Sequence, residues 1–336
     1  MNHEKLRADA LASNTLIMAS IELTEVCNLS CAHCYIPKEK SELSLESAKA
    51  VIDKLYQLGV LYLTFTGGEI FSYSPFREVY LYAKSKGFII SLMTNGTLIN
   101  NRIKKLLKAY KPYNVSITVY GLTPQDYIHF TGKDSYKELI DGLDFFESSD
   151  IPFSLKTVLV KANYSKALRG DYEALALRYN TSMVYDPIIF GKKDGDTSSI
   201  EQRLTADEII QFENSMDETI AFWKKAVLDK ATEPSIRCGG GLSSLSIDSN
   251  GNVAICSLFV TEKCEFLTSS PEELKQFLLS THSLMQKRFE QSPCFSCEKK
   301  SLCRWCSAYA NLEHGSGSEA IHFFCELAER RVDCFG

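Results

Sequence analysis

The distribution of twelve cysteines is the feature that most restricts the fold and the chemistry of this chain. Cys27, Cys31 and Cys34 lie close together near the N-terminus, and the other nine lie between Cys238 and Cys334. The N-terminus has no apolar segment of the signal-peptide type, which indicates a cytoplasmic location where thiols stay reduced. Metal binding therefore explains the cysteines better than disulfides do, and their asymmetric distribution indicates more than one domain.

The composition is that of a globular protein and excludes several functional classes. Apolar residues make up 45% of the 336 residues and charged residues 24%, both ordinary values. No apolar run reaches the ~18 residues needed to cross a bilayer. Lys and Arg number 37 against 42 Asp and Glu, and this net charge of −5 provides no basic surface for nucleic acid or for an anionic membrane. We expect neither a nucleic-acid nor a membrane partner.

Strand-like and helix-like segments alternate between the two cysteine groups. The strand-like segments are rich in β-branched and aromatic residues and span 17–23, 60–66, 88–94, 114–120, 152–160 and 181–187. Helical patterns span 44–58, 75–86, 98–110, 135–149 and 165–179. This alternation predicts a parallel α/β sheet, either a partial barrel or an open doubly wound sheet. In both architectures ligands bind at the carboxyl ends of the strands.

The remaining segments complete the predicted organisation. Residues 187–203 read as a polar loop, 205–229 as a helix, and 271–291 as a helix that begins at Pro271. Ser249-Asn250-Gly251 predicts a tight hairpin turn. The predicted divisions are an N-terminal extension (1–16), a barrel (17–190), a linker and helix (191–235) and a cysteine-rich domain (236–336).

The first cysteine group, CNLSCAHC, places three thiols directly after the first predicted strand. Structural zinc is almost always bound by four ligands. Iron–sulfur clusters are held by closely spaced thiolates, and a cubane with three protein ligands leaves one iron open for a substrate or cofactor. The spacing favours the open cluster. A zinc-binding interaction protein on an α/β scaffold is the alternative from a different functional class.

Motifs at three successive strand ends together resemble the radical S-adenosylmethionine (radical SAM) enzymes. They are CxxxCxxC, Thr66-Gly67-Gly68-Glu69 and Thr94-Asn95-Gly96. The resemblance implies a partial (β/α)6 TIM-like barrel in which Cys27, Cys31 and Cys34 hold a [4Fe–4S] cluster. It also implies a SAM site made by His33, Tyr35, Gly67, Gly68, Glu69, Thr94, Asn95 and Thr118. Within that site it sets Glu69 at the SAM amino group, Asn95 near the ribose and His33 near the adenine.

The later cysteines resemble the SPASM domain of radical SAM maturases, which holds two auxiliary [4Fe–4S] clusters. Alone, their paired CxxC units would favour a zinc ribbon. The resemblance implies a proximal cluster on Cys238, Cys256 and Cys306, with Cys264 as a tentative fourth ligand. It implies a distal cluster on Cys294, Cys297, Cys303 and Cys325. Cys334 is left over as an ordinary C-terminal thiol.

The resemblance implies three [4Fe–4S] clusters, SAM as cofactor, and oxidative crosslinking of a ribosomally made peptide through carbon–carbon, carbon–oxygen or thioether bonds. A sulfatase-type oxidation is less favoured, because Ser257 stands where such maturases tend to carry Asp. Non-peptide substrates such as tetrapyrroles or sugars stay open. The expected partners are a precursor peptide, an electron donor of the flavodoxin or ferredoxin type, and a separate leader-recognition protein as an alternative to direct binding.

The sequence does not identify a catalytic base. Asp186, Asp194 and Asp196 flank the predicted 187–203 loop near the expected cleft. Aspartates in a polar loop are more often solvated carboxylates than general bases, so this is the interpretation that the sequence favours.

Overall fold

The computed structural model describes residues 3–37, 40–228 and 238–336. Its strands form one nine-stranded sheet in the order β6-β5-β4-β3-β2-β1-β7-β8-β9. Six parallel strands form the predicted α/β unit: β1 (Met18–Thr24), β2 (Tyr62–Gly67), β3 (Ile89–Thr94), β4 (Asn114–Thr118), β5 (Phe153–Val158) and β6 (Met183–Asp186). All six predicted strands are confirmed.

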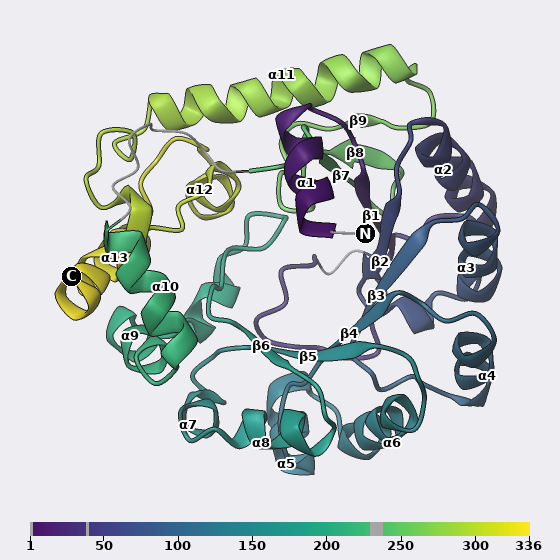
Figure 1. Ribbon diagram of the computed structural model, residues 1–336, viewed down its shortest axis with the longest axis horizontal. Helices are drawn as coiled ribbons and strands as arrows, with labels where there is room; N and C mark the ends of the chain where they lie inside the picture. The colour runs from purple at the N-terminus through teal and green to yellow at the C-terminus, as the bar shows by residue number, and fades with distance from the viewer. Residues whose placement is uncertain (1–2, 38–39, 229–237) are drawn as a thin grey trace.

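The strand order decides between the two architectures that the sequence left open. A doubly wound sheet reverses its strand order at a switch point. Here β1 to β6 follow one another without reversal, so the crossover helices lie on one side of the sheet. Figure 1 shows these strands curving around the centre of the molecule with α2, α3, α4 and α6 outside them. The partial barrel is confirmed.

The helices between the strands are α2 (Leu45–Gln57), α3 (Phe76–Ser85), α4 (Asn101–Ala109), α5 (Pro124–Thr131), α6 (Tyr136–Glu147), α7 (Tyr164–Leu168) and α8 (Asp171–Arg178). Ser44 caps α2 by accepting a hydrogen bond from the Ser47 backbone. The helix predicted over 165–179 is instead two helices, because Gly170 takes a left-handed conformation between them. Sequence periodicity also missed α5, which is short and begins at Pro124 after the Thr123 cap.

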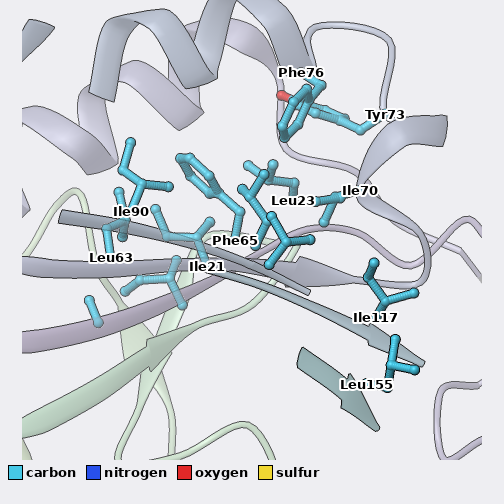
Figure 2. Packing of buried hydrophobic residues seen from close by; sticks show 14 of the residues in the cluster. Ile21, Leu23, Leu63, Phe65, Ile70, Tyr73, Phe76, Ile90, Ile117 and Leu155 are labelled. Atoms are coloured by element: carbon cyan, nitrogen blue, oxygen red, sulfur yellow. The ribbon is translucent and has the colours of Figure 1, made fainter. Parts of the chain in front are cut away.

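The main core lies between the sheet and the outer helices. Ile21 and Leu23 of β1 pack with Phe65 of β2, Phe76 of α3 and Ile90 of β3, as Figure 2 shows. Each of these side chains is almost completely buried, and such burial stabilises the fold by roughly 1.5–3 kcal/mol per side chain. The period of two along β1 then directs Ser20 and Glu22 to the opposite, inner face of the sheet.

The C-terminal part of the chain extends the same sheet. β7 (Ser244–Ile247) pairs in parallel with β1, and β8 (Asn252–Ala254) and β9 (Cys264–Glu265) follow it antiparallel. The predicted hairpin turn is confirmed, with Gly251 at a positive φ. The predicted boundary at 236 lies outside the described residues, and the strands before and after it belong to one sheet. The division into domains stays a prediction.

The remaining helices lie around this extension. They are α1 (His3–Ala12), η2 (Ser198–Gln202), α9 (Ala206–Glu213), α10 (Asp217–Leu228), α11 (Pro271–Glu290), α12 (Ser307–His314) and α13 (His322–Phe335), with the short turns η1 (Ile70–Ser72) and η3 (Lys300–Leu302). The helix predicted over 205–229 is instead α9 and α10, and residue 229 lies outside the described residues. The helix predicted over 271–291 is confirmed as α11, with a capping box at Ser270. No helix in the described ranges is long and apolar enough to span a membrane.

Candidate functional site

The first cysteine group occupies the loop that leaves β1 at the carboxyl end of the barrel. Burial raises the pKa of Cys27 and of Cys31. The neighbouring thiols Cys34 and Cys27 raise the pKa of Cys31 further. Thiols of this kind are poor free nucleophiles, and they become thiolates when a metal binds them.

The thiols are not arranged around a single ion. Within residues 3–37, 40–228 and 238–336, no group of three or more His, Cys, Asp or Glu side chains could hold one metal ion. Zinc requires every sulfur within ~2.3 Å of the ion, whereas a cluster spreads its thiolate ligands over separate irons. Closely spaced thiols are the donor chemistry that such a cluster uses.

The two glycines of the Gly-Gly-Glu motif allow the cysteine loop to lie against β2. A Cβ atom on Gly68 would come within 2.4 Å of the Val26 carbonyl oxygen, and one on Gly67 within 2.2 Å of the Thr24 oxygen. The Gly68 amide donates to the Thr24 carbonyl at 2.7 Å, and the Glu69 amide donates to the Val26 carbonyl at 3.0 Å. The motif therefore fixes the backbone immediately before Cys27, which is a structural requirement for glycine that the sequence did not reveal.

The Glu69 carboxylate is enclosed and accepts three hydrogen bonds from the protein. Its side chain has no exposed surface. Oε1 accepts from the Thr94 hydroxyl at 2.7 Å and from the Phe71 amide at 3.1 Å, and Oε2 accepts from the Asn95 amide at 2.7 Å. Burial raises the pKa of Glu69, and these hydrogen bonds oppose that effect. Glu69 thus connects the Gly-Gly-Glu motif to the Thr-Asn-Gly motif. A direct contact between this carboxylate and SAM stays a prediction.

Asn95 continues this network to the cysteine loop. Its Nδ2 donates to Asn28 Oδ1 at 2.9 Å and approaches Cys27 Sγ at 3.8 Å. Its Oδ1 accepts from the Thr97 amide and hydroxyl, and Thr97 Oγ1 accepts in turn from Asn28. Sequence reasoning missed Asn28 and Thr97. Their positions beside the cysteine and Asn-Gly motifs were the available signal.

The predicted adenine-contacting residue lies in an aromatic pocket. The His33 ring is 5.0 Å from the Phe130 ring and 5.8 Å from the Tyr120 ring, and burial lowers the pKa of His33 to about 4. A neutral imidazole among aromatic rings suits a flat, uncharged ring as a neighbour. Tyr120 and Phe130 were also missed by the sequence reasoning. Thr118 ends β4 on the inner side of the sheet, in register with Lys156.

Tyr35 lies between the first cysteine group and the C-terminal cysteines. Burial raises the pKa of its hydroxyl, and the charges of Glu22, Cys34 and Cys256 act in the same direction. Its carbonyl accepts from the Lys193 amide at 3.0 Å. The Lys193 ammonium in turn forms a buried ion pair with Glu22 at 2.7 Å. The loop predicted over 187–203 is thereby fastened to the residue that follows the cysteine motif.

The structure brings together three of the four thiols predicted for the proximal cluster. Burial raises the pKa of Cys256, and nearby Cys306 and Cys238 raise it further. Burial also raises the pKa of Cys306, and Cys238 adds to that effect. Cys264 is in a different environment on β9, where Lys54 and Glu273 are the charged groups that act on it. The role of Cys264 as a fourth ligand stays a prediction.

The four thiols predicted for the distal cluster lie together beyond α11. Burial raises the pKa of Cys294, and nearby Cys325 and Cys297 raise it further. The pKa of Cys303 is raised in the same way, by burial and then by Cys294 and Cys325. Trp305 packs on Phe289, with ring centres 5.4 Å apart, and donates to the Glu319 carbonyl. Three thiols on short loops and one on α13 are the donor chemistry that an iron–sulfur cluster uses.

A cavity of about 1250 Å³ joins these thiols to the barrel. Residues near the ends of β5 and β6 form one part of its wall. Six C-terminal cysteines line another part: Cys238, Cys294, Cys297, Cys303, Cys306 and Cys325. It is large enough to accept more than the inorganic groups, because ligand pockets typically measure ~300–1,000 Å³. The cavity therefore provides a space where a substrate could lie between the barrel and the C-terminal cysteines.

Comparison with known proteins agrees with this geometry. Residues 21–166 match the family model described as the radical SAM superfamily. The chain is 27% identical over 258 residues to the antilisterial bacteriocin subtilosin biosynthesis protein AlbA of Bacillus subtilis, covering 73% of this chain and 55% of that protein. It is 30% identical over 147 residues to an AdoMet-dependent heme synthase of Methanosarcina barkeri, covering 42% of each chain. The chain thus spans about half the length of these curated relatives.

The fold also matches solved structures over nearly the whole chain. The structure of Streptococcus suis SuiB bound to S-adenosylmethionine superimposes with a TM-score of 0.70 at 15% identity, covering 95% of this chain and 80% of SuiB. SuiB has also been solved bound to its precursor peptide SuiA. At this identity the likeness concerns the fold alone. Residues 21–166 of the present chain therefore match the radical SAM superfamily, within a chain whose overall fold is similar to that of SuiB.

Proposed function

We propose that this protein is a radical SAM maturase that oxidatively crosslinks side chains of a ribosomally made peptide in the cytoplasm. The observation that carries the proposal is the convergence of three separate groups of thiols on the barrel end and on the cavity beside it. A crosslink removes two electrons and two hydrogens from the substrate, so it needs a site that generates a radical and a site that accepts an electron.

The residues present fit the cofactors that this proposal requires. Cys27, Cys31 and Cys34 would hold a [4Fe–4S] cluster with one iron open to SAM, at the strand ends where Asn95 and His33 lie. Cys238, Cys256 and Cys306 would hold the proximal auxiliary cluster, and the four thiols beyond α11 would hold the distal one. When bound, the clusters and SAM supply one-electron and hydrogen-atom chemistry, and the protein supplies orientation and exclusion of water.

The chain's own residues have definable tasks in this proposal. Glu69 fixes the ends of β2 and β3 relative to each other through Thr94 and Asn95. Asn95 orients the loop of Cys27 through Asn28. The Glu22–Lys193 pair holds the 187–203 loop against β1, beside Tyr35. A flavodoxin or ferredoxin would supply the electron, and the precursor would bind directly or through a separate leader-recognition protein.

The choice of peptide over other substrates is supported by the relatives. AlbA is named for the biosynthesis of a bacteriocin, and it matches a longer part of this chain than the heme synthase does. The heme synthase matches over 147 residues, a length comparable to that of the region matching the radical SAM family. A tetrapyrrole is therefore the second candidate substrate, and a sulfatase-type oxidation of Ser or Cys follows it.

The test is anaerobic turnover of the reconstituted protein with the small peptide encoded beside its gene. A mass loss of about two units in the peptide, with formation of 5′-deoxyadenosine, is the expected result. Cleavage of SAM without change in the peptide, together with turnover of a porphyrin, would instead favour the second candidate.

A further inference from the structure

An ion pair at the carboxyl ends of β5 and β6 lines the cavity. Lys156 Nζ lies 3.2 Å from Asp186 Oδ2, and each side chain keeps 38% of its surface exposed. Both residues belong to the cavity wall, together with Cys238, Cys306 and Tyr309. The parallel register sets Asp186 opposite Val158 and Lys156 opposite Val184, so both residues occupy the inner face of the sheet.

This pair lies close to both predicted cluster sites. Val158, the register partner of Asp186, packs in one apolar cluster with Cys31 of the first cysteine loop. Asp186 and Lys156 also share the cavity wall with the proximal thiols Cys238 and Cys306. A substrate that bridges the radical site and the auxiliary cluster would therefore pass beside the Asp186 carboxylate.

The other carboxylates in this region are already engaged or lie elsewhere. Glu69 has no exposed surface and accepts three protein hydrogen bonds. Glu22 is 2% exposed and is held by Lys193 through both oxygens. The cavity wall also contains Glu298 and Glu329, but they flank the distal thiols, and Glu329 pairs with Lys299 at 2.7 Å. Among the described residues, Asp186 is the carboxylate on the barrel side of the cavity wall that keeps an exposed side chain.

We propose that Asp186 is the catalytic proton acceptor in the oxidation of the substrate, with Lys156 as its positioning residue. This inference rests on the proposed crosslinking function. With SAM and the first cluster held beside Cys27, Cys31 and Cys34, a first substrate C–H bond would break, and its hydrogen atom would leave in 5′-deoxyadenosine. The substrate radical then forms the new bond to a second group X–H. That group loses its proton to Asp186 Oδ and one electron to a one-electron acceptor of the iron–sulfur class, so the substrate loses two hydrogens and two electrons.

A carboxylate paired with lysine is sufficient for this step. Loss of an electron makes the X–H proton strongly acidic, so the acceptor has to be ionised and correctly placed rather than strongly basic. Lys156 Nζ lies 3.2 Å from Oδ2 and so orients the carboxylate. Among the described residues, Oδ1 accepts a single long hydrogen bond, from the Ile188 amide at 3.3 Å. This oxygen retains lone pairs that can take a proton.

The experiment compares Asp186→Asn with the unchanged holoenzyme, using a uniformly deuterated precursor peptide from beside the gene. The variant should form deuterium-containing 5′-deoxyadenosine at about the normal rate, because hydrogen-atom transfer does not use Asp186. Crosslinked product should fall by about 100-fold or more, within the range for loss of a general base. Iron content and the equilibrium affinities for SAM and for the peptide should be unchanged.

Matched variants separate this role from a structural one. Asp194→Asn makes the same chemical change in the 187–203 loop, outside the cavity wall, and should keep the normal ratio of product to deoxyadenosine. Lys156→Arg should retain most product and Lys156→Met should not. A normal product ratio in Asp186→Asn would overturn the proposal, as would loss of its SAM or peptide affinity. Absence of product with the unchanged enzyme would instead count against the crosslinking function itself.

Discussion

At the scale of single residues, the strand-end motifs serve the packing of the protein as well as its proposed chemistry. Gly67 and Gly68 let the backbone of the cysteine loop approach more closely than any side chain would permit. Glu69 joins two motifs that are separate in the sequence. Substitutions here should therefore act on the cysteine loop before they act on any bound molecule.

Replacement of Gly68 by Ala should displace the loop that carries Cys27. The new methyl group would lie 2.4 Å from the Val26 oxygen and 2.6 Å from the Glu25 oxygen, both backbone atoms. We expect a loss of about 1–3 kcal/mol in the free energy of unfolding, together with loss of iron from the first cluster. Urea denaturation and iron analysis measure the two effects.

Gly59→Ala is the matched control for this glycine. A Cβ at Gly59 meets no atom within 4 Å, so the substitution costs only the backbone strain of a positive φ, about 1 kcal/mol. Its iron content should stay normal. Equal iron loss in both variants would contradict the role assigned to Gly68.

Glu69→Ala should lower the affinity for SAM. The substitution leaves the Thr94 hydroxyl and the Asn95 and Phe71 amides without their acceptor in a buried site. An affinity loss worth about 1.5–3 kcal/mol, or roughly 10- to 150-fold, is expected from the displaced strand ends. Equilibrium dialysis with SAM measures this affinity. An unchanged dissociation constant would refute the placement of Glu69 at the SAM site.

At the scale of secondary-structure elements, one buried ion pair fixes the last helix. Arg331 of α13 donates to Glu213 of α9 at 2.6 and 2.9 Å and to the Leu302 carbonyl at 2.7 Å. The guanidinium also lies 3.8 Å from the ring centre of Trp223 on α10. It joins two helices to the η3 turn that precedes Cys303, so it stabilises the support of the distal thiols.

Arg331→Met should destabilise the protein by about 3–5 kcal/mol, because Glu213 would stay buried without its partner. The neighbouring Arg330 forms an exposed pair with Asp207 at 2.9 Å, so Arg330→Met should cost only about 0–1 kcal/mol. Urea unfolding of both variants measures the difference. The double variant Glu213→Met/Arg331→Met should recover much of the loss, and failure to do so would show that the Trp223 contact dominates.

At the scale of the whole molecule, the separation of the three thiol groups predicts that the clusters can be lost independently. The full protein should bind on the order of 11–12 iron atoms if each group holds a cubane. Replacing Cys27, Cys31 and Cys34 by Ala should remove about a third of this iron and abolish SAM cleavage. Replacing Cys294 and Cys297 should preserve SAM cleavage but abolish product.

Iron analysis, Mössbauer spectroscopy and a 5′-deoxyadenosine assay check these outcomes together. Ser replacement at Cys334, which lies at the exposed end of α13, is the control and should change none of them. An iron content near four in the full protein would contradict the auxiliary clusters and leave the radical SAM domain intact.

The sequence alone determined the strands of the barrel, the order of the motifs at their ends and the grouping of the cysteines. These properties depend on short-range patterns: alternating burial, turn residues and ligand spacing. The tertiary structure decided that β7 joins the barrel sheet beside β1 and that the Glu69 carboxylate faces Thr94 and Asn95. It also brought Asp186 into the cavity, where local sequence favoured a solvated loop carboxylate. These outcomes depend on contacts between residues far apart in the chain, because only the folded sheet fixes which strand ends and loops become neighbours.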